Sequence, residues 1–342
     1  DRAASPTRDP AGTGLMTFGE VPLAHAKGAV LAHSQRLVSG VLKKGTVLDA
    51  AHIEALAAAG HDAVVVARLA PTDMDEDSAA LEIGRVLLSD GLRLGPAFTG
   101  RVNVIAEEAG LLRVNPAQID ALNRIDEGLT LATLPDLMRV DADQLVGTVK
   151  IIPYGIARSV VETGASCLAG DAMRLEPFRG GTARLVMTET PGFKASLLAK
   201  GEEGVRARLD ALHYDLRDVV TVPHETGSVA QVLAPDHDLT LILGASATSD
   251  RGDVAPAAVM AAGGRIDRFG MPVDPGNLLF LGEIGGRPVV GLPGCARSPA
   301  LNGVDWVLER LSAGIGVTSE DVAAMGVGGL LKEMPERPQP RR

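Results

Sequence analysis

The 342-residue sequence predicts an α/β protein whose carboxyl-terminal part forms a doubly wound, mostly parallel sheet. The first observation is that short apolar runs alternate with amphipathic helical patterns between residues 181 and 330, as they do in strand–helix–strand units. The second is the length of the chain, which suits two or three domains, each with its own core. Aromatic residues make up only 3% of the chain, so Ala, Val, Leu and Gly must supply that core.

Changes in composition along the chain predict five segments. Residues 1–15 are polar and rich in Pro and Gly, and we expect a disordered extension there. Residues 16–97 are predicted to form an amino-terminal α+β region, and residues 98–180 a β-rich middle lobe. Residues 181–330 are predicted to form the α/β domain that carries the ligand site. The Pro- and Arg-rich residues 331–342 are expected to be a flexible tail.

The amino-terminal region shows clear helix and strand signals. Asp49 is placed to cap a helix that ends at Gly60, and the apolar run at 63–67 predicts a buried strand. A second helix is expected to open with four acids. They could be metal ligands, but carboxylates in a first turn complement the helix dipole, and we favour that interpretation. The four are Asp73, Asp75, Glu76 and Asp77.

The middle lobe is predicted to consist of short strands around one helix. The runs RVNVIA, LTLATL and GTVKIIPYGI have the alternation of strands, and the helix follows Asn115 and Pro116. Lys150 and Arg158 are expected at its surface or rim.

Three strands in the last domain are predicted to end at one edge of a sheet. The first ends at Thr188 and Glu189, the second is the run DVVTV, and the third is the apolar run at 239–243. Ligands of such sheets bind at the carboxyl ends of the strands, so we expect the site there. A Gly285-Gly286 turn then predicts a hairpin, which extends the sheet.

The third strand leads into a loop of small and hydroxyl residues, Gly244 to Gly252, and then into an Ala-rich helix. Small side chains let a ligand approach the backbone N–H groups, and a helix amino terminus attracts anions. Asp253 stands at the expected N-cap of that helix. The stretch therefore fits an anion site, and it fits equally well an ordinary strand-to-helix connection with a capping Asp.

Composition excludes several partners and sites. The net charge of −10 and the lack of a basic run argue against nucleic acid, and no apolar run reaches the ~20 residues of a membrane span. Cys167 and Cys295 predict neither a disulfide framework nor a zinc–thiolate cluster, and a cytoplasmic location is expected. For Cys295 we favour packing as a small apolar side chain over a role as a reactive thiol. Packing or surface roles are expected for His213, His224 and His237.

Two segments together resemble the molybdopterin molybdotransferases. Residues 271–303 resemble the family's stretch from a Pro-Gly-Lys turn through a hairpin to a Leu-Pro-Gly-Asn-Pro turn. Residues 244–258 are similar both to the family's Gly-Gly-Val-Ser loop and to a loop of molybdopterin adenylyltransferases that continues into Arg-Asp and Thr-Pro. Residues 33–80 are similar to the family's amino-terminal segment, with a Lys-Gly turn, a helix and a strand.

The resemblance implies a molybdopterin-binding protein of molybdenum cofactor biosynthesis, with the ligand's phosphate on the loop and Asp253 in the position of the family's reactive acid. Asp253 and Asp250 are the expected catalytic residues. Asp253 is also the expected ligand of a Mg²⁺ ion beside the phosphate. Molybdate is the other expected substrate. The remaining expected ligand-binding residues are Thr188, Gly244, Ala245, Ser246, Ala247, Thr248, Ser249, Pro275, Gly276, Asn277, Pro293, Gly294, Cys295 and Ser298.

The resemblance also implies partners. Relatives with this order of segments pair through the amino-terminal lobe, so we expect a homodimer. The middle lobe looks more like a branch that often precedes a cofactor nucleotidyltransferase domain, so a downstream domain or protein of that kind is an expected partner.

The departures from the family pattern bear on activity. Asn277 stands where the family has Lys, which removes a fixed positive charge that could hold molybdate. Ala245 replaces a loop Gly, and Cys295 with Ala296 replaces an Asn-Pro pair. We therefore expect a transferase-like protein that binds molybdopterin but inserts molybdate weakly or not at all.

Three functions remain open. The first is an enzyme or carrier of cofactor assembly, acting in molybdate insertion or nucleotide transfer. The second is a molybdopterin sensor or chaperone without turnover, and the third is an unrelated nucleotide-binding α/β domain. A pterin that co-purifies with the protein would separate the first two from the third, and turnover with molybdate would separate the first from the second.

Overall fold

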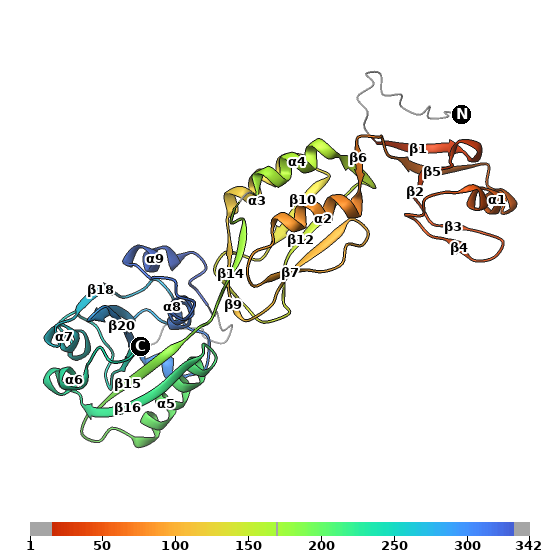
Figure 1. Ribbon diagram of the computed structural model, residues 1–342. Coiled ribbons are helices and arrows are strands. Elements are labelled where there is room, and N and C mark those ends of the chain that lie inside the picture. Colours follow the sequence, from red (N-terminus) through yellow and green to blue (C-terminus); the bar gives the residue numbers. More distant parts are fainter. Residues whose placement is uncertain (1–15, 169, 332–342) are drawn as a thin grey trace. The chain divides into compact units, whose positions relative to one another are not determined.

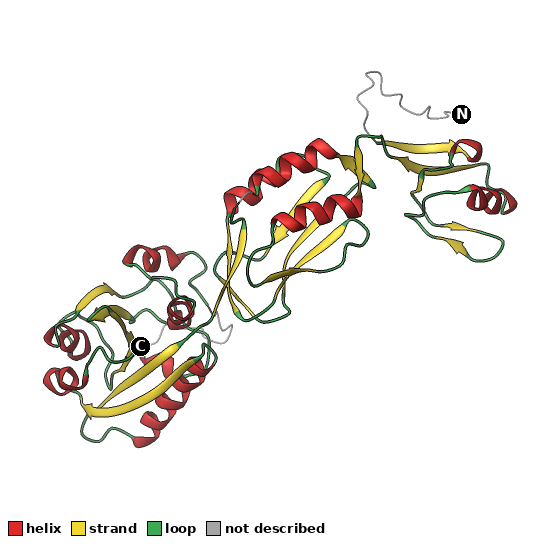
Figure 2. Cartoon of the chain, viewed as in Figure 1, coloured by secondary structure: helices red, strands yellow, loops and turns green. Residues whose placement is uncertain are grey.

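A computed structural model describes residues 16–168 and 170–331 of the chain. The expected extension at 1–15 and nearly all of the expected tail lie outside these residues. The chain divides into two compact units, residues 1–175 and 176–342, and both contain helices and strands (Figure 2). The predicted mixed α/β architecture is confirmed. No helix among the described residues is long and apolar enough to cross a membrane.

The first unit begins with a three-stranded antiparallel sheet in the order β1-β5-β2, which packs against α1 (Figure 1). The predicted cap of α1 is confirmed, because the backbone N–H of His52 donates to Asp49 Oδ1 at 2.8 Å. Leu56 of α1 is fully buried in this core, and Gly60 follows the helix with φ +85°. The elements are β1 (Thr17–Pro22), β2 (Val30–Leu31), β3 (Gln35–Arg36), β4 (Val41–Leu42), α1 (Ala50–Ala58) and β5 (Ala63–Arg68).

The rest of the first unit has a four-stranded sheet, β10-β12-β8-β7, and a three-stranded sheet, β11-β9-β14. Helices α2, α3 and α4 accompany these sheets. The elements are β6 (Asp73–Asp75), α2 (Glu76–Val86), β7 (Leu92–Leu94), β8 (Arg101–Ala106), β9 (Gly110–Val114), α3 (Pro116–Asn123), β10 (Leu129–Thr133), β11 (Met138–Val140), β12 (Leu145–Ile151), β13 (Gly155–Ala157), α4 (Arg158–Cys167) and β14 (Met173–Pro177).

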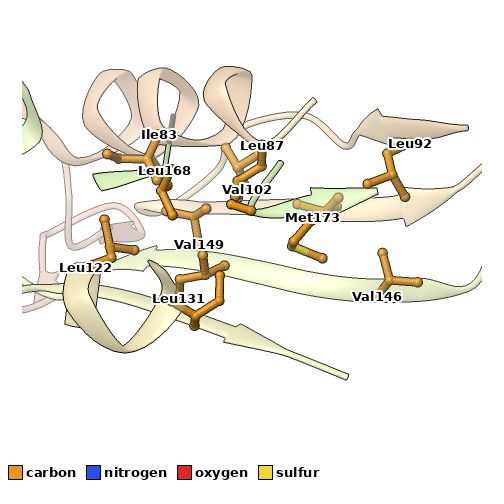
Figure 3. Close-up of a cluster of buried hydrophobic side chains, with 14 of the residues drawn as sticks. Ile83, Leu87, Leu92, Val102, Leu122, Leu131, Val146, Val149, Leu168 and Met173 are labelled. Carbon is orange, nitrogen blue, oxygen red and sulfur yellow. The ribbon is translucent and has the colours of Figure 1, made fainter. Parts of the chain in front are cut away.

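One hydrophobic core joins α2 to the middle lobe. Ile83 and Leu87 of α2 lie in the same buried cluster as Val102 of β8 and Val149 of β12 (Figure 3). The division expected between residues 97 and 98 therefore falls inside this core. Helix α4 was not predicted, because its first residues follow Ala157, which offers no side-chain cap, and its sequence is rich in Ser, Thr and Gly.

The acidic start of α2 is explained by helix capping. Asp75 is the N-cap and accepts a hydrogen bond from the Ser78 backbone N–H. Burial is the largest single influence on the pKa of its carboxyl and raises it, but hydrogen bonds from the Ser78 side chain and backbone together outweigh burial and leave the pKa lowered. Asp77 accepts from the Gly100 backbone N–H at 2.6 Å. Among the described residues, no group of three His, Cys, Asp or Glu side chains is placed to hold a metal ion.

The second unit is built on a six-stranded sheet in the order β16-β15-β17-β20-β19-β18. The neighbours from β16 to β20 are parallel, and β19 and β18 extend the sheet in antiparallel fashion, so the sheet is mixed. The elements are β15 (Gly181–Glu189), α5 (Ala195–Asp210), β16 (Tyr214–Pro223), α6 (Thr226–Val232), β17 (Leu239–Leu243), α7 (Val254–Ala261), β18 (Arg265–Phe269), β19 (Phe280–Ile284), β20 (Arg287–Leu292), the 3-10 helix η2 (Gly294–Arg297), α8 (Gly303–Ser312) and α9 (Ser319–Ala323).

Helices lie on both faces of this sheet. On one face, Val229 of α6 and Ala258 of α7 share a buried cluster with Ile242 of β17. On the other face, α5 approaches so closely that a Cβ at Gly201 would lie 2.7 Å from the Leu243 side chain. The predicted Gly285-Gly286 hairpin joins β19 to β20. The short helix α6 was not predicted.

Candidate functional site

Strands β15, β16, β17 and β20 run parallel, so their last residues lie at one edge of the sheet, here called the carboxyl edge. Thr188 is the next-to-last residue of β15, the loop at 244–249 follows β17, and the turn at 293–298 follows β20. Phe280, the first residue of β19, pairs with Gly291 near the end of β20, which brings the turn at 275–277 to the same edge. The structure thus gathers every expected site segment along one edge.

The loop after β17 is fixed at both of its ends. At the first end, the Ala245 backbone N–H donates to Thr188 Oγ1 at 2.7 Å, and Thr188 is fully buried. At the other end, the backbone N–H groups of Ser249 and Asp250 donate to the Asp253 carboxylate. Between the two ends, the backbone N–H groups of residues 246–248 have no hydrogen-bond partner among the described residues, and they are available to an anion.

Asp253 is the N-cap residue of α7 by conformation, as predicted, but its side chain does not bond to the helix. Its Oδ2 atom accepts hydrogen bonds from the loop instead, and the bond from the Ser249 backbone is the main reason that the pKa of this carboxyl is lowered. Asp250 closes a smaller turn, because its Oδ1 accepts the Gly252 N–H at 2.7 Å. Both carboxylates therefore shape the loop.

Arg297 is the cation that the fold places beside the loop. Its Nη2 donates to the Gly244 carbonyl at 2.8 Å, and its guanidinium lies 6.0 Å from the centre of the Phe193 ring. Its Nε is buried and has no hydrogen-bond partner among the described residues, and burial lowers the pKa of the guanidinium. The charge is therefore held near the loop by a carbonyl and an aromatic ring.

Two other arginines of the second unit, Arg251 and Arg287, are engaged elsewhere. Arg251 donates to the Ile266 carbonyl at 3.1 Å. Arg287 is the first residue of β20, at the opposite edge of the sheet, where it pairs with Asp238 at 2.6 Å.

The turn at 275–277 packs tightly against the start of α8. The Gly303 N–H donates to the Pro275 carbonyl at 2.8 Å. Gly276 has φ +139°, and a Cβ there would lie 2.8 Å from the Gly303 nitrogen, so glycine is required. Asn277 is exposed, and its amide Nδ2 lies 3.4 Å from the Met271 carbonyl.

The turn at 293–298 is held by a buried arginine of α5 that the sequence did not single out. Arg208 pairs with Asp305 at 2.7 Å, and it also donates to a group of backbone carbonyls. These are the carbonyls of Gly204, Ala296, Ser298 and Ala300. Cys295 accepts a hydrogen bond from Asn302 Nδ2 at 3.2 Å, which ties its thiol to the start of α8.

His224 is a second site residue that sequence reasoning missed. It follows the last residue of β16, and its Nδ1 lies 2.8 Å from Thr188 Oγ1. The predicted end of the run DVVTV could have pointed to it, because polar residues that follow the strands of such a sheet gather at the ligand edge.

An open pocket of about 350 Å³ lies at the ends of β15 and β16. It is lined by Glu189, Thr190, Pro191, Gly192, Phe193 and Pro223. Phe193 also contacts Arg297, so the pocket lies next to the cation of the loop. Its volume is in the range of small-molecule sites, roughly 300–1,000 Å³.

Comparisons with known proteins give a family match for a small part of the chain. Residues 20–68 match a domain of unknown function, DUF8806, which covers the amino-terminal sheet with α1. No curated protein matches the sequence.

Among solved structures, the chain is similar to the molybdopterin biosynthesis MoeA protein of Pyrococcus horikoshii, with 12% identity and a TM-score of 0.30, over 87% of this chain and 76% of that one. It is also similar to a molybdenum cofactor biosynthesis protein B, with 16% identity and a TM-score of 0.27. A third similar structure is the molybdopterin biosynthesis enzyme MoaB of Thermus thermophilus, with 14% identity and a TM-score of 0.27. The last two each cover 39% of this chain and 88% of their own. With TM-scores this low, the function must be argued from the chain's own residues.

Proposed function

We propose that the second unit binds molybdopterin at the carboxyl edge of its sheet, with the phosphate on the loop at 244–249. The observation that carries the proposal is the set of backbone N–H groups at 246–248, which lie between two hydrogen-bonded ends of the loop. Backbone N–H groups that no protein atom occupies can donate hydrogen bonds to an anion. The sequence resemblance of residues 244–258 and 271–303 supplies the identity of the ligand.

Two further features support an anionic ligand with a ring system. Arg297 adds a positive charge beside the loop, and its desolvated guanidinium strengthens any contact with a phosphate. The neighbouring pocket offers Phe193 and two prolines to an apolar or aromatic group. A phosphate and a planar ring are the two parts of molybdopterin that such a surface would hold.

We propose that molybdate insertion is weak or absent. Holding an oxyanion beside the dithiolene needs a positioned cation, and the turn at 275–277 carries the neutral Asn277. The function that fits best is therefore a molybdopterin-binding member of cofactor assembly, with impaired molybdotransferase turnover. A sensor or chaperone is the second candidate, and the exposed, neutral Asn277 favours it.

The proposal is tested by titrating the full chain with molybdopterin and comparing wild type with Ser246→Glu. The new carboxylate would stand where the phosphate belongs, and we expect affinity to fall roughly tenfold or more. The matched control is Glu203→Gln on α5, which alters a charge on the same unit away from the loop. Affinity of Ser246→Glu equal to that of wild type would remove the loop from the site.

A Mg²⁺ ion at the loop would need oxygen ligands from the bound phosphate as well as from the protein. Asp253 Oδ2 and Asp250 Oδ1 accept hydrogen bonds from the loop, which leaves one oxygen on each carboxylate for a cation. We propose that Mg²⁺ binds there together with the phosphate, because hard oxygen ligands are its preference. Calorimetry should show Mg²⁺ binding only when ligand is present, and an Asp253→Ala variant that binds Mg²⁺ equally well would exclude this site.

Two partners are proposed as well. A homodimer through the amino-terminal region should scatter light as about twice 35.4 kDa, and a particle of 35.4 kDa at micromolar concentration would contradict it. A downstream nucleotidyltransferase domain or protein would take the bound cofactor, and it should be retained on the immobilised chain when pterin is present.

A further inference from the structure

His224 occupies a defined place at the carboxyl edge that the proposed function leaves unused. Its Nδ1 lies 2.8 Å from Thr188 Oγ1, and the same hydroxyl oxygen accepts the Ala245 N–H at 2.7 Å. Thr188 is fully buried, while His224 is half-buried. The three residues form a chain of hydrogen bonds from the loop backbone to the imidazole.

This chain determines which ring nitrogen carries the proton. The buried Thr188 hydroxyl needs an acceptor for its hydrogen, and His224 Nδ1 is the acceptor within reach among the described residues. The hydroxyl therefore donates to Nδ1, and the neutral ring carries its proton on Nε2. The opposite tautomer would leave the Thr188 hydrogen buried without an acceptor.

The ring lies near the start of the loop. A Cβ built on Gly244 would be 3.8 Å from His224 Cε1, the ring carbon between the two nitrogens, and 3.9 Å from the Ser246 backbone nitrogen. The ring also lies within electrostatic reach of the Asp253 carboxylate, at the far end of the loop. Nε2 has no hydrogen-bond partner among the described residues. It is a donor at the same edge of the sheet as the free backbone N–H groups at 246–248.

We propose that His224 donates its Nε2–H to the phosphate of the bound ligand, and that it selects a phosphate monoester. The inference rests on the proposed function, since it places the phosphate on the loop. The loop and the imidazole come from the ends of two different strands. With the N–H groups of 246–248 on two terminal oxygens, the imidazole takes the third. A phosphate monoester has that third terminal oxygen, whereas a phosphate joined to a nucleotide, like a diester, has only two. The site therefore binds the monophosphate form of the cofactor in preference to a nucleotide-linked form.

The test uses methyl phosphate and dimethyl phosphate as probes, titrated into the full chain and followed by backbone amide NMR signals of residues 246–248. His224→Asn keeps an acceptor near Thr188 but removes the Nε2 donor. We expect this variant to bind methyl phosphate with about tenfold lower affinity, because a hydrogen bond to a charged group is lost. Its affinity for dimethyl phosphate should equal that of wild type. Glu225→Ala, the exposed neighbour, is the control and should bind both probes like wild type.

The outcomes separate the inference from the proposed function. If His224→Asn binds methyl phosphate like wild type while His224→Ala binds it poorly, the imidazole only supports Thr188 and the inference is overturned. An equal loss for both probes overturns the selection of a monoester. If methyl phosphate leaves the amide signals of 246–248 unmoved in wild type, the loop site itself is wrong. Nitrogen-15 spectra of the free protein that place the His224 proton on Nδ1 would also contradict the inference.

Discussion

The two edges of the six-stranded sheet carry charged side chains in opposite ways. At the edge where the parallel strands begin, here called the amino edge, arginines form ion pairs with carboxylates. Arg184 lies 3.1 Å from both Asp218 and Asp236, and Arg287 lies 2.6 Å from Asp238. At the carboxyl edge, Arg297 donates to a backbone carbonyl and makes no ion pair with the described residues. An ion pair attracts an anionic ligand only weakly, because its two charges cancel. A cation that is bonded to a carbonyl still attracts such a ligand.

The difference shows why the number of arginines near a site is a poor guide to its charge. His237 repeats the pattern of the amino edge, since it lies between Asp218 and Asp236 at 3.1 and 2.8 Å. The His224 ring, at the carboxyl edge, is hydrogen-bonded to a threonine hydroxyl and makes no ion pair within the part of the chain that the structure describes. Charges at the amino edge stabilise the fold, and polar groups at the carboxyl edge remain open to a ligand.

The largest effect should come from Arg208, on which the turn at 293–298 depends. Arg208→Ala would remove the buried cation that pairs with Asp305 and donates to several carbonyls. We expect the free energy of unfolding to fall by roughly 3–5 kcal/mol, measured by urea denaturation. Arg217→Ala, which breaks the exposed pair with Asp215, should cost at most about 1 kcal/mol. Equal losses would mean that the carboxyl edge does not depend on this residue.

A new cation at the carboxyl edge should raise activity. Asn277→Lys adds a positive charge to the turn at 275–277, and we expect any molybdate insertion to rise by about 10²–10³. Leu278→Lys adds the same charge one position further along and should do much less. If wild type already inserts molybdate at full speed, Arg297 supplies the charge and the interpretation of Asn277 is wrong.

A matched pair of substitutions compares the two edges directly. Arg297→Met should weaken ligand binding about tenfold, because a charge-assisted contact with the phosphate is lost. Arg287→Met removes the same charge from the same sheet at the amino edge and should leave the affinity unchanged, although it frees Asp238. The comparison fails if both variants lose affinity to the same extent.

The smallest effect concerns pH. Hydrogen bonds from Thr182 are the main reason that the pKa of Asp238 is lowered from its ordinary value of 3.8. The folded state therefore gains stability from the ionised carboxylate above that value, and it loses this gain as the pH falls through the lowered pKa. Thermal unfolding should show a small loss below about pH 4, and Asp238→Asn should flatten that part of the profile. A steeper profile in the variant would contradict the assignment.

The sequence predicted the elements that have strong local signals. The cap at Asp49 and the hairpin at Gly285-Gly286 depend on residues within a few positions of each other, and both are present. Helices α4 and α6 were missed because Ser, Thr and Gly interrupt their sequences and weaken the helical pattern. Local patterns therefore predict an element only where its residues favour that structure.

The candidate site was predicted in outline but not in its chemistry. The strand ends at Thr188, Gly244 and Pro293 lie at one edge, as expected. Arg208 and His224 were missed because their roles depend on partners 97 and 36 residues away. Such long-range contacts leave no pattern in the neighbouring sequence. The carboxylate of Asp253 likewise bonds to the loop rather than to the helix.

The central claim is that the carboxyl edge of the second unit binds a molybdopterin phosphate. The most direct measurement is the pterin content of the full chain after purification from cells that make molybdopterin, read as fluorescence after oxidation. Cells unable to make it provide the blank. The account predicts pterin in wild type in near-equal amount to protein, and its loss in Ser246→Glu. A folded wild-type chain without pterin that also fails to bind added molybdopterin would contradict the account.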